Sequence, residues 1–330
     1  MLKPAYKLTL GKQTVDTTDE PQASSVVDLH VVLDMDTPAD RFRLELGQVG
    51  GLSPARDDDA IIELGYADNG GLSRVMTGKI SRVEPGLTTE WITGYSPAAS
   101  LLQTFVDQTY ENKTAGDIAR DLASQATIDV ATADAGITFP AYVIDGRRNV
   151  DRHLRDLAGL CGFDLYVNTD GGLVFQRFSN GNSIHIFEYG EHIIELQASR
   201  SQPSAASVEA WGESPGSGAD EAWAWLTKDF GDSKGSAGTD APTLLLERPA
   251  LRSATAAQTA ADARLTDINR RTIRGQLMSV GRAEVRLGDA IRLQGVPESD
   301  LNDTFQIRKV SHRITKVAGF TTTIGFRSLT

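Results

Sequence analysis

The histidines are the residues of this chain best suited to bind a metal ion or to transfer a proton. Five occur, and none belongs to a His-Glu-x-x-His motif, which would place two metal ligands on one face of a helix. His185 and His192, with Glu188 and Glu191 close to them, could supply nitrogen and oxygen ligands to zinc. The residues around them are typical of a strand followed by a turn, which leaves the polar heads in solvent. We therefore expect no metal site.

The cysteine and the acidic clusters form no recognisable catalytic set. Cys161 falls on the apolar stripe of an expected helix, where a thiol is buried and unreactive. Asp300 and Asp303 have no partner acid in the arrangement that glycoside hydrolysis requires. The run at 56–59, Arg-Asp-Asp-Asp, lacks the spacing of a calcium-binding loop. The sequence thus predicts no catalytic residue, no cofactor and no enzymatic activity.

Two tryptophans are the best candidates for contact with a sugar ring. Trp223 and Trp225 share one face if the stretch 222–226 is extended. An aromatic pair of this kind stacks on a sugar or, more commonly, fills a packed face or a protein interface. His30 lies in a β-branched run at 26–33, and we expect it to form a hydrogen bond across neighbouring strands.

Length and composition indicate a folded protein of about two domains. The chain has 330 residues, of which 40% are hydrophobic and 23% are charged, so a packed core is expected and general disorder is excluded. The net charge is -11, which argues against binding to nucleic acid or to an anionic membrane surface, since both attract positive charge. One cysteine is too few for a disulfide framework.

The sequence gives no sign of export or of membrane insertion. No apolar run approaches the roughly 18 residues that a membrane-spanning helix requires. The N-terminal stretch lacks the apolar core of a secretory signal peptide, so we expect assembly in the cytoplasm. The two Asn-x-Thr sequences, at Asn112 and Asn302, are therefore expected to carry no glycan.

Three regions differ in their periodicity. Residues 1–95 are rich in strand patterns, such as the strict alternation at 41–46. Residues 96–183 carry helical spacing and a hairpin, which predicts a small α+β module. Residues 184–330 are again β-rich, with one Ala-rich helix at 254–268.

Local signals mark the ends of two helices in the module. Thr114 followed by Asp117 resembles a capping box, with aspartate in place of the usual glutamate or glutamine. Asn149 is a good N-cap for a further helix, and Gly162 suits the left-handed position that ends it. In the last region, the Gly-, Ser- and Asp-rich stretches near 212–220 and 230–242 are expected to be mobile loops.

The two β-rich regions share a pattern, which suggests an internal repeat. The matches come in the same order in both regions, although β-sheets reuse these residue types and each match is degenerate. They are Asp59-Ala60-Ile61 with Asp289-Ala290-Ile291; Thr77, Ile80 and Val83 with Thr304, Ile307 and Val310; and Gly94-Tyr95 with Gly325-Phe326. From this order we expect two similar β-domains, with the paired Ile and Val side chains on equivalent faces.

A series of motifs along nearly the whole chain resembles a known family. The motifs are TGKISRVE at 77–84, GYSPAASLL at 94–102, the helical stretch 110–123, the helix and hairpin at 149–176, the strand at 287–293 and FQIRKVSHRI at 305–314. In this order they resemble the late control D family, the baseplate-hub proteins of contractile phage tails. The hub portion of type VI secretion VgrG spikes is more distantly similar.

This resemblance implies a fold and a set of partners. It implies an α+β, mostly β protein with two tube-like β-barrel domains, at 1–95 and 184–330, and the α+β module of 96–183 inserted between them. It also implies a homotrimer that joins a hexameric tail tube protein to a trimeric spike among other baseplate proteins. Relatives fused to a spike continue beyond the second barrel, so a separate spike protein is expected here. No nucleic acid and no membrane insertion are expected.

The function expected from the sequence is therefore structural. The chain would be a hub in the baseplate of a phage tail or of a contractile injection system, where it matches threefold to sixfold symmetry. Two alternatives remain open at this stage. One is a cell-wall glycan hydrolase of a baseplate, and the other is a carbohydrate-binding β-protein.

Overall fold

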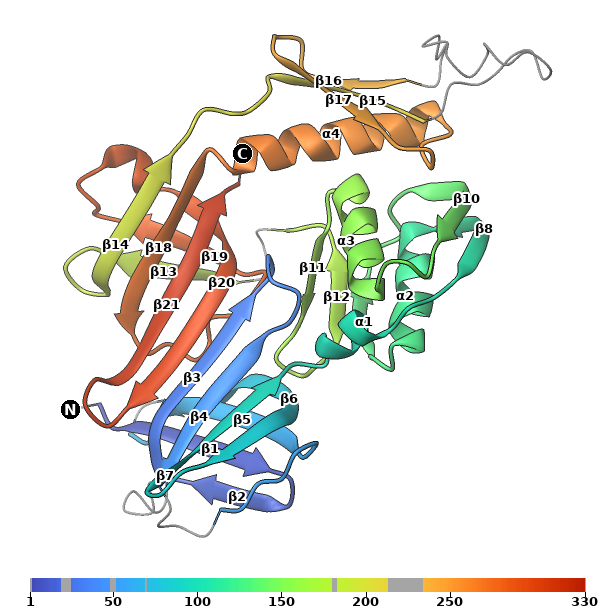
Figure 1. The fold of residues 1–330 in the computed structure, drawn as a ribbon. Helices are drawn as coiled ribbons and strands as arrows, with labels where there is room; N and C mark the ends of the chain where they lie inside the picture. The colour runs from blue at the N-terminus through green and yellow to red at the C-terminus, as the bar shows by residue number, and fades with distance from the viewer. Residues whose placement is uncertain are drawn as a thin grey trace, which may run out of the picture.

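The computed structural model describes residues 2–18, 25–47, 52–68, 70–179, 183–212 and 234–329. Strands dominate these ranges, and the chain is a mostly-β α+β protein, as predicted. Figure 1 shows the strands of the N-terminal and C-terminal parts as one continuous layer, with a helical module beside it and the long helix α4 across its upper end.

The elements follow one another in three groups. The first group is β1 (Pro4–Leu10), β2 (Gln13–Asp16), β3 (Val26–Asp34), β4 (Arg41–Gly47), β5 (Asp59–Tyr66), β6 (Gly71–Pro85) and β7 (Thr89–Tyr95). The second is α1 (Ala99–Gln103), β8 (Gln108–Thr114), α2 (Ala115–Gln125), β9 (Val130–Ala133), β10 (Thr138–Ile144), α3 (Val150–Cys161), β11 (Asp164–Val167) and β12 (Leu173–Gln176). The third is β13 (Ile184–Glu188), β14 (Ile193–Arg200), β15 (Ser207–Trp211), β16 (Gly235–Ala237), β17 (Thr243–Glu247), α4 (Ala254–Arg270), β18 (Ile273–Val280), β19 (Ala290–Gln294), β20 (Thr304–Thr315) and β21 (Gly319–Ser328).

One large sheet joins the first and third groups. Its path runs β14-β18-β21-β20-β3-β4-β7-β6-β5-β1-β2, and β19 with β13 branches from β20. Within the described residues neither half closes into a complete barrel. The two halves form one sheet because β20 pairs with β19 only near its start, while its second half, residues 309–315, pairs with β3 of the other group.

The two groups repeat the same five-stranded unit. The first unit has the order β3-β4-β7-β6-β5, and the second has the order β14-β18-β21-β20-β19. Every neighbouring pair in both units is antiparallel, and the strands follow one another along the chain in the same sequence. The units differ at their outer strand, since β1 runs antiparallel to β5 whereas β13 runs parallel to β19.

Irregularities in the ladders fix the alignment of the two units. The register between β6 and β7 shifts just after Ile80, and the register between β20 and β21 shifts just after Ile307. A second shift follows Val26 between β3 and β4, and it recurs after Ile193 between β14 and β18. Because a bulge is a specific local feature, its recurrence at matching positions supports the repeat more strongly than the sequence matches do.

The alignment corrects two of the predicted matches, the first of them in β5 and β19. The isoleucine before the bulge donates its N–H to the carbonyl of Asp58 in the first unit and of Asp289 in the second. Ala60 therefore corresponds to Ile291, and the predicted match of the two Asp-Ala-Ile motifs is wrong by one residue. The slip matters because it exchanges the faces of a strand. Ala60 and Ile291 are both buried, whereas Ile61 is half exposed.

A glycine and a phenylalanine face each other at the same place in both units. In the first unit Phe42 of β4 lies opposite Gly94 of β7, and in the second Gly275 of β18 lies opposite Phe326 of β21. A Cβ atom on Gly94 would lie 2.3 Å from the Phe42 ring, and one on Gly275 would lie 2.4 Å from the Phe326 ring. The ring covers the neighbouring backbone in each case. Gly94 therefore corresponds to Phe326, and Phe42 corresponds to Gly275, so the predicted match of Gly94-Tyr95 with Gly325-Phe326 is also wrong by one residue.

We expect Gly94→Ala to lower the free energy of unfolding by about 1–3 kcal/mol, the usual cost of overpacking. The added methyl would also lie 2.4 Å from the Lys79 carbonyl oxygen, which is backbone and moves little. Gly159 in α3 is the matched control, since a Cβ there meets nothing within 4 Å. Gly159→Ala should instead stabilise by about 0.5–1 kcal/mol. Denaturant unfolding of both variants checks this, and equal effects would contradict the close packing.

The second group forms the α+β module, and its helix ends agree with the prediction. Thr114 and Asp117 make the reciprocal hydrogen bonds of a capping box on α2. The Asn149 side chain caps α3, and Gly162 ends that helix at a φ of 68°. Small sheets complete the module, namely β8 with β10 and β9 with β11 and β12.

A second core joins the module to α4 and the small sheet β16-β15-β17. The described residues 205–212 and 234–268 thus pack with the module, although the sequence analysis grouped them with the second β-region. Within the range 230–242, predicted as a mobile loop, residues 235–237 form β16, and Gly235 lies against the backbone of Ala257 in α4. Residues 213–220 and 230–233 lie outside the described residues.

Candidate functional site

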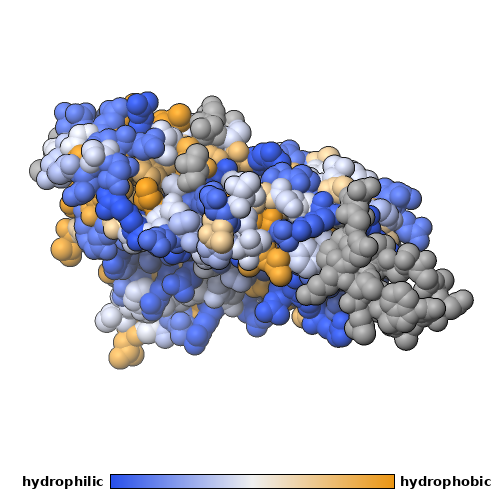
Figure 2. Space-filling model, turned by 90° about the horizontal axis from the view of Figure 1, so that it is seen from above, coloured by the Kyte–Doolittle hydropathy of each residue, from blue (hydrophilic) through white to orange (hydrophobic). Residues whose placement is uncertain are grey.

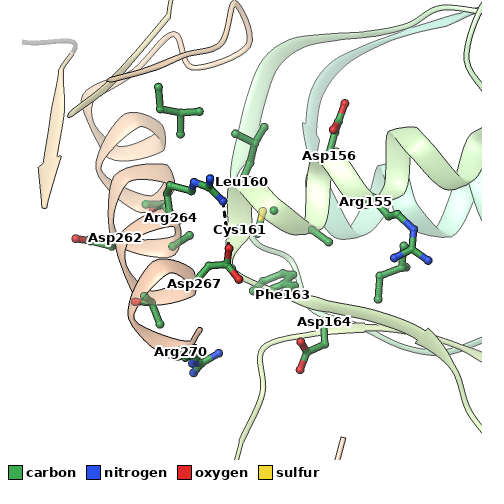
Figure 3. Close-up of a pocket in the computed structure, with 18 of the residues that line it drawn as sticks. Arg155, Asp156, Leu160, Cys161, Phe163, Asp164, Asp262, Arg264, Asp267 and Arg270 are labelled. Atoms are coloured by element: carbon green, nitrogen blue, oxygen red, sulfur yellow. Dashed lines mark hydrogen bonds and ion pairs between the residues drawn. The ribbon is translucent and has the colours of Figure 1, made fainter. Parts of the chain in front are cut away.

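A charged cavity of about 830 Å³ lies where the module, α4 and the large sheet meet. In Figure 3, Arg264 and Asp267 extend from α4, Arg155 and Asp156 belong to α3, and Asp164 lies at the start of β11. The lining holds six acidic residues and eight arginines, an excess of two positive charges in a chain of net charge -11. The arginines are Arg155, Arg177, Arg248, Arg264, Arg270, Arg271, Arg308 and Arg327.

A network of ion pairs at the base of this cavity connects three parts of the fold. Arg308 of β20 donates to Asp164 at 2.6 Å and to Asp36 at 2.5 Å. Arg327 of β21 lies 3.6 Å from Asp164 and donates to Asp267 of α4 at 3.3 Å. The network therefore links the sheet, the module and α4. Arg308, Arg327 and Asp164 form its buried centre, while Asp267 is partly exposed and Asp36 lies at the surface.

Burial and charge oppose each other in this network. Burial works against ionisation of Asp36, but the adjacent Arg308 guanidinium outweighs it and lowers the pKa of this carboxyl. Burial, together with the charge of Arg308, lowers the pKa of Arg327 to about 10. Both groups stay charged at neutral pH, so Asp36 and Arg327 act as fixed charges in the network.

Asp40, in the turn before β4, is the carboxyl group most like a catalytic acid. It is 5% exposed, and burial raises its pKa to about 7. Its Oδ1 accepts a hydrogen bond from the Asp34 N–H at 2.8 Å, and Asp34 itself pairs with Lys309. Two acids in such different environments are what a glycoside hydrolase uses. The adjacent space measures only about 10 Å³, however, which holds at most a water molecule and no sugar.

The structure separates the predicted candidate metal ligands. His185 contacts Asp289 at 2.9 Å, while His192 accepts a hydrogen bond from the N–H of Glu188. No group of three or more His, Cys, Asp or Glu side chains in the described ranges is placed to hold a metal ion. His30 bonds Ser311 of β20 at 2.8 Å, across the strand pair as expected.

Cys161 and Asp300, two other candidate residues, are a buried thiol and a member of an ion pair. Cys161 lines the charged cavity but is 1% exposed, and burial raises the pKa of its thiol to about 11. Asp300 pairs with Arg200 at 2.6 Å. Trp223 and Trp225 lie outside the described residues. Two Gly-x-Ser-x-Gly sequences, at 212–216 and 231–235, resemble a hydrolase serine motif and fall mostly outside the described part of the chain.

Several strand edges of the large sheet have no ladder partner among the described residues, and two of them belong to the repeated units. The first, here named the β14 edge, is the side of Ile193–Arg200 that faces away from β18. The second, named the β6 edge, is the stretch 82–85 after the bulge, which pairs with β7 but not with β5. Figure 2 shows one face of the molecule, where polar side chains predominate and apolar ones are scattered. Unpaired strand edges are ready sites for pairing with another chain.

Comparison with solved structures places the whole chain in one known fold. A 43 kDa tail protein of prophage MuSo2 from Shewanella oneidensis matches with a TM-score of 0.73 over 99% of this chain and 98% of its own, at 15% identity. A tail protein from Neisseria meningitidis matches with a TM-score of 0.69, covering 99% and 96% of the two chains at 14% identity. The fold is that of a phage tail protein.

A type VI secretion component shares this tail-protein fold more distantly. The E. coli protein matches with a TM-score of 0.58 over 93% of this chain and 74% of its own, at 11% identity. The predicted resemblance to phage-tail and type VI hub proteins is thus confirmed at the level of fold. No protein-family model and no curated protein sequence matches the chain. None of the helices in the described ranges is long and apolar enough to cross a membrane.

Proposed function

We propose that this protein is a structural hub of a baseplate, in a phage tail or a contractile injection system. The observation that carries the proposal is the duplicated five-stranded unit within a tail-protein fold. Three chains with two units each would present six similar units. Such a ring could bind a hexameric tail tube protein on one side and a trimeric spike protein on the other. The domain bounds 1–95, 96–183 and 184–330 belong to the same proposal.

The hub function implies where this chain lies in the assembled particle. The chain would assemble as a homotrimer in the cytoplasm and then occupy the baseplate, in contact with the tube, a trimeric spike and other baseplate proteins. The E. coli protein of similar fold is described as a component of the type VI secretion system with structural similarity to phage tail proteins, which supports this placement.

The charges of the fold suit a mechanical role. Ion pairs bind the module and α4 to the sheet through Arg308 and Arg327, so load on one part reaches the others. Four of the carboxylates that line the charged cavity, those of Asp36, Asp156, Asp164 and Asp267, are paired with arginines. The space beside Asp34 and Asp40 is too small for a sugar. These features favour assembly over glycan hydrolysis as the function.

Two measurements on the purified protein test the proposal. Light scattering at rising concentration should give the mass of three chains, alone or after addition of the tube or spike partner. An assay of peptidoglycan hydrolysis should give no turnover. Release of soluble glycan by the purified protein would favour the hydrolase, and a monomer in the presence of both partners would contradict the hub.

A further inference from the structure

The junction between the two units inside one chain shows how such units can join. The second half of β20 pairs antiparallel with β3 over Lys309–Thr315. At this junction Arg313 pairs with Asp28 at 2.6 Å, and Lys309 pairs with Asp34 at 3.2 Å. The junction therefore joins β20 of the second unit to β3, the first strand of the first unit.

The same two surfaces recur in the other unit, where they are unpaired. By the bulge alignment, β6 corresponds to β20 and β14 corresponds to β3. The β6 edge is thus the counterpart of the β20 stretch that pairs with β3, and the β14 edge is the counterpart of the β3 side that pairs with β20. Within the described residues, each edge lacks the partner that its counterpart has.

Apolar side chains of β14 are less buried than those at the matching positions of β3, as expected for a strand that lacks a partner on one side. Leu29 and Val31 of β3 are fully buried, whereas their counterparts on the β14 edge, Leu196 and Ala198, are half-buried. Ile194, the bulged residue of β14, is 56% exposed. A strand paired with residues 198–201 of the β14 edge would cover Ala198, as β20 covers Val31.

We propose that the β6 edge of one copy pairs antiparallel with the β14 edge of a second copy. The pairing repeats the register of the junction inside the chain, so that Glu84 lies opposite Ser199, as Ser311 lies opposite Val32. The contact is head-to-tail, and such contacts either close into a ring or grow into a filament. This inference rests on the proposed hub function, in which three copies close the ring through three such contacts and three internal junctions.

Engineered cysteines test the register. The double variant Glu84→Cys with Ser199→Cys should form disulfides between copies under mild oxidation, because opposed residues in a sheet lie within the span of a disulfide. The covalent product on a non-reducing gel should reach three chains and stop there. The native Cys161 is buried and does not compete.

Matched variants make the result decisive. Val32→Cys with Ser311→Cys has the same register inside the chain and should link within one copy, which shows that the geometry permits a bond. Glu84→Cys with Ala198→Cys places one cysteine on the opposite face of β14 and should give no link.

Two outcomes would overturn the inference and separate it from the hub function. If light scattering shows self-association but only the internal pair links, the edges are wrong while the oligomer stands. If the chain stays monomeric at its highest soluble concentration and no link between copies forms, pairing between these edges is wrong, and the hub role is decided by the particle itself.

Discussion

Replacing Asp164 by alanine is expected to lower the free energy of unfolding by about 3–5 kcal/mol. The carboxylate is buried and lies within 3.6 Å of both Arg308 and Arg327. These arginine side chains are 14% and 11% exposed, so its loss leaves two guanidinium groups short of a partner in a region that water scarcely enters. Denaturant unfolding followed by circular dichroism measures the change.

An exposed ion pair provides the control for Asp164. Asp170 pairs with Arg74 at 2.9 Å and is 67% exposed, and exposed pairs contribute about 0–1 kcal/mol. Asp170→Ala should therefore change stability little. If the two variants behave alike, the Arg308 network does not hold the module, α4 and the sheet together.

Acid is expected to weaken the junction between the two units through His312. This residue of β20 pairs with Val31 of β3, is fully buried and contacts the Thr322 hydroxyl at 3.0 Å. Burial lowers its pKa to about 3, against about 6.5 in an unfolded chain. Below pH 6.5 the unfolded chain takes up a proton that the folded chain refuses. Stability is therefore complete above pH 6.5 and falls by about 1.4 kcal/mol per pH unit as the pH drops toward 3.

Variants of His312 separate this titration from packing. His312→Leu and His312→Gln remove the ionisable group, and the glutamine can still bond Thr322. Both should flatten the pH dependence of the unfolding free energy between pH 6.5 and 4.5 by about 1.4 kcal/mol per unit. Parallel curves for the wild type and the variants would contradict a neutral buried histidine.

Helix ends could be predicted because they depend on a few neighbouring residues. The capping box of Thr114 and the caps of α3 at Asn149 and Gly162 have the predicted form. In each case a side chain or a left-handed glycine satisfies backbone groups only a few positions away. These signals do not depend on the rest of the fold.

Strand registers could be predicted only in part. The matches of Ile80 with Ile307 and of Val83 with Val310 agree with the bulge alignment. The two Asp-Ala-Ile motifs slip by one residue, and so does the match of Gly94 with Gly325. Strand residue types are degenerate, and the register depends on bulges that the sequence does not mark. The prediction missed β16. Gly235 lacks a side chain because its backbone lies close to α4, but a glycine among serines is also typical of a loop.

The charged cavity and the unpaired edges could not be predicted at all. Arg308 and Asp164 are separated by 144 positions along the chain and meet only in the folded protein. The repeat predicted two similar β-domains, but the β14 edge and the β6 edge could be identified only by comparison with the internal junction of β20 with β3. Long-range pairing of this kind is set by topology, which local patterns do not encode.

A three-dimensional reconstruction of the assembled particle tests the central claim most directly. The account predicts three copies of this chain in a threefold ring at the end of the tube, with six similar β-units around a central channel. Within each chain β20 should pair with β3, and between chains the β6 edge should pair with the β14 edge. Six copies of the chain, or a position without contact to the end of the tube, would contradict the account.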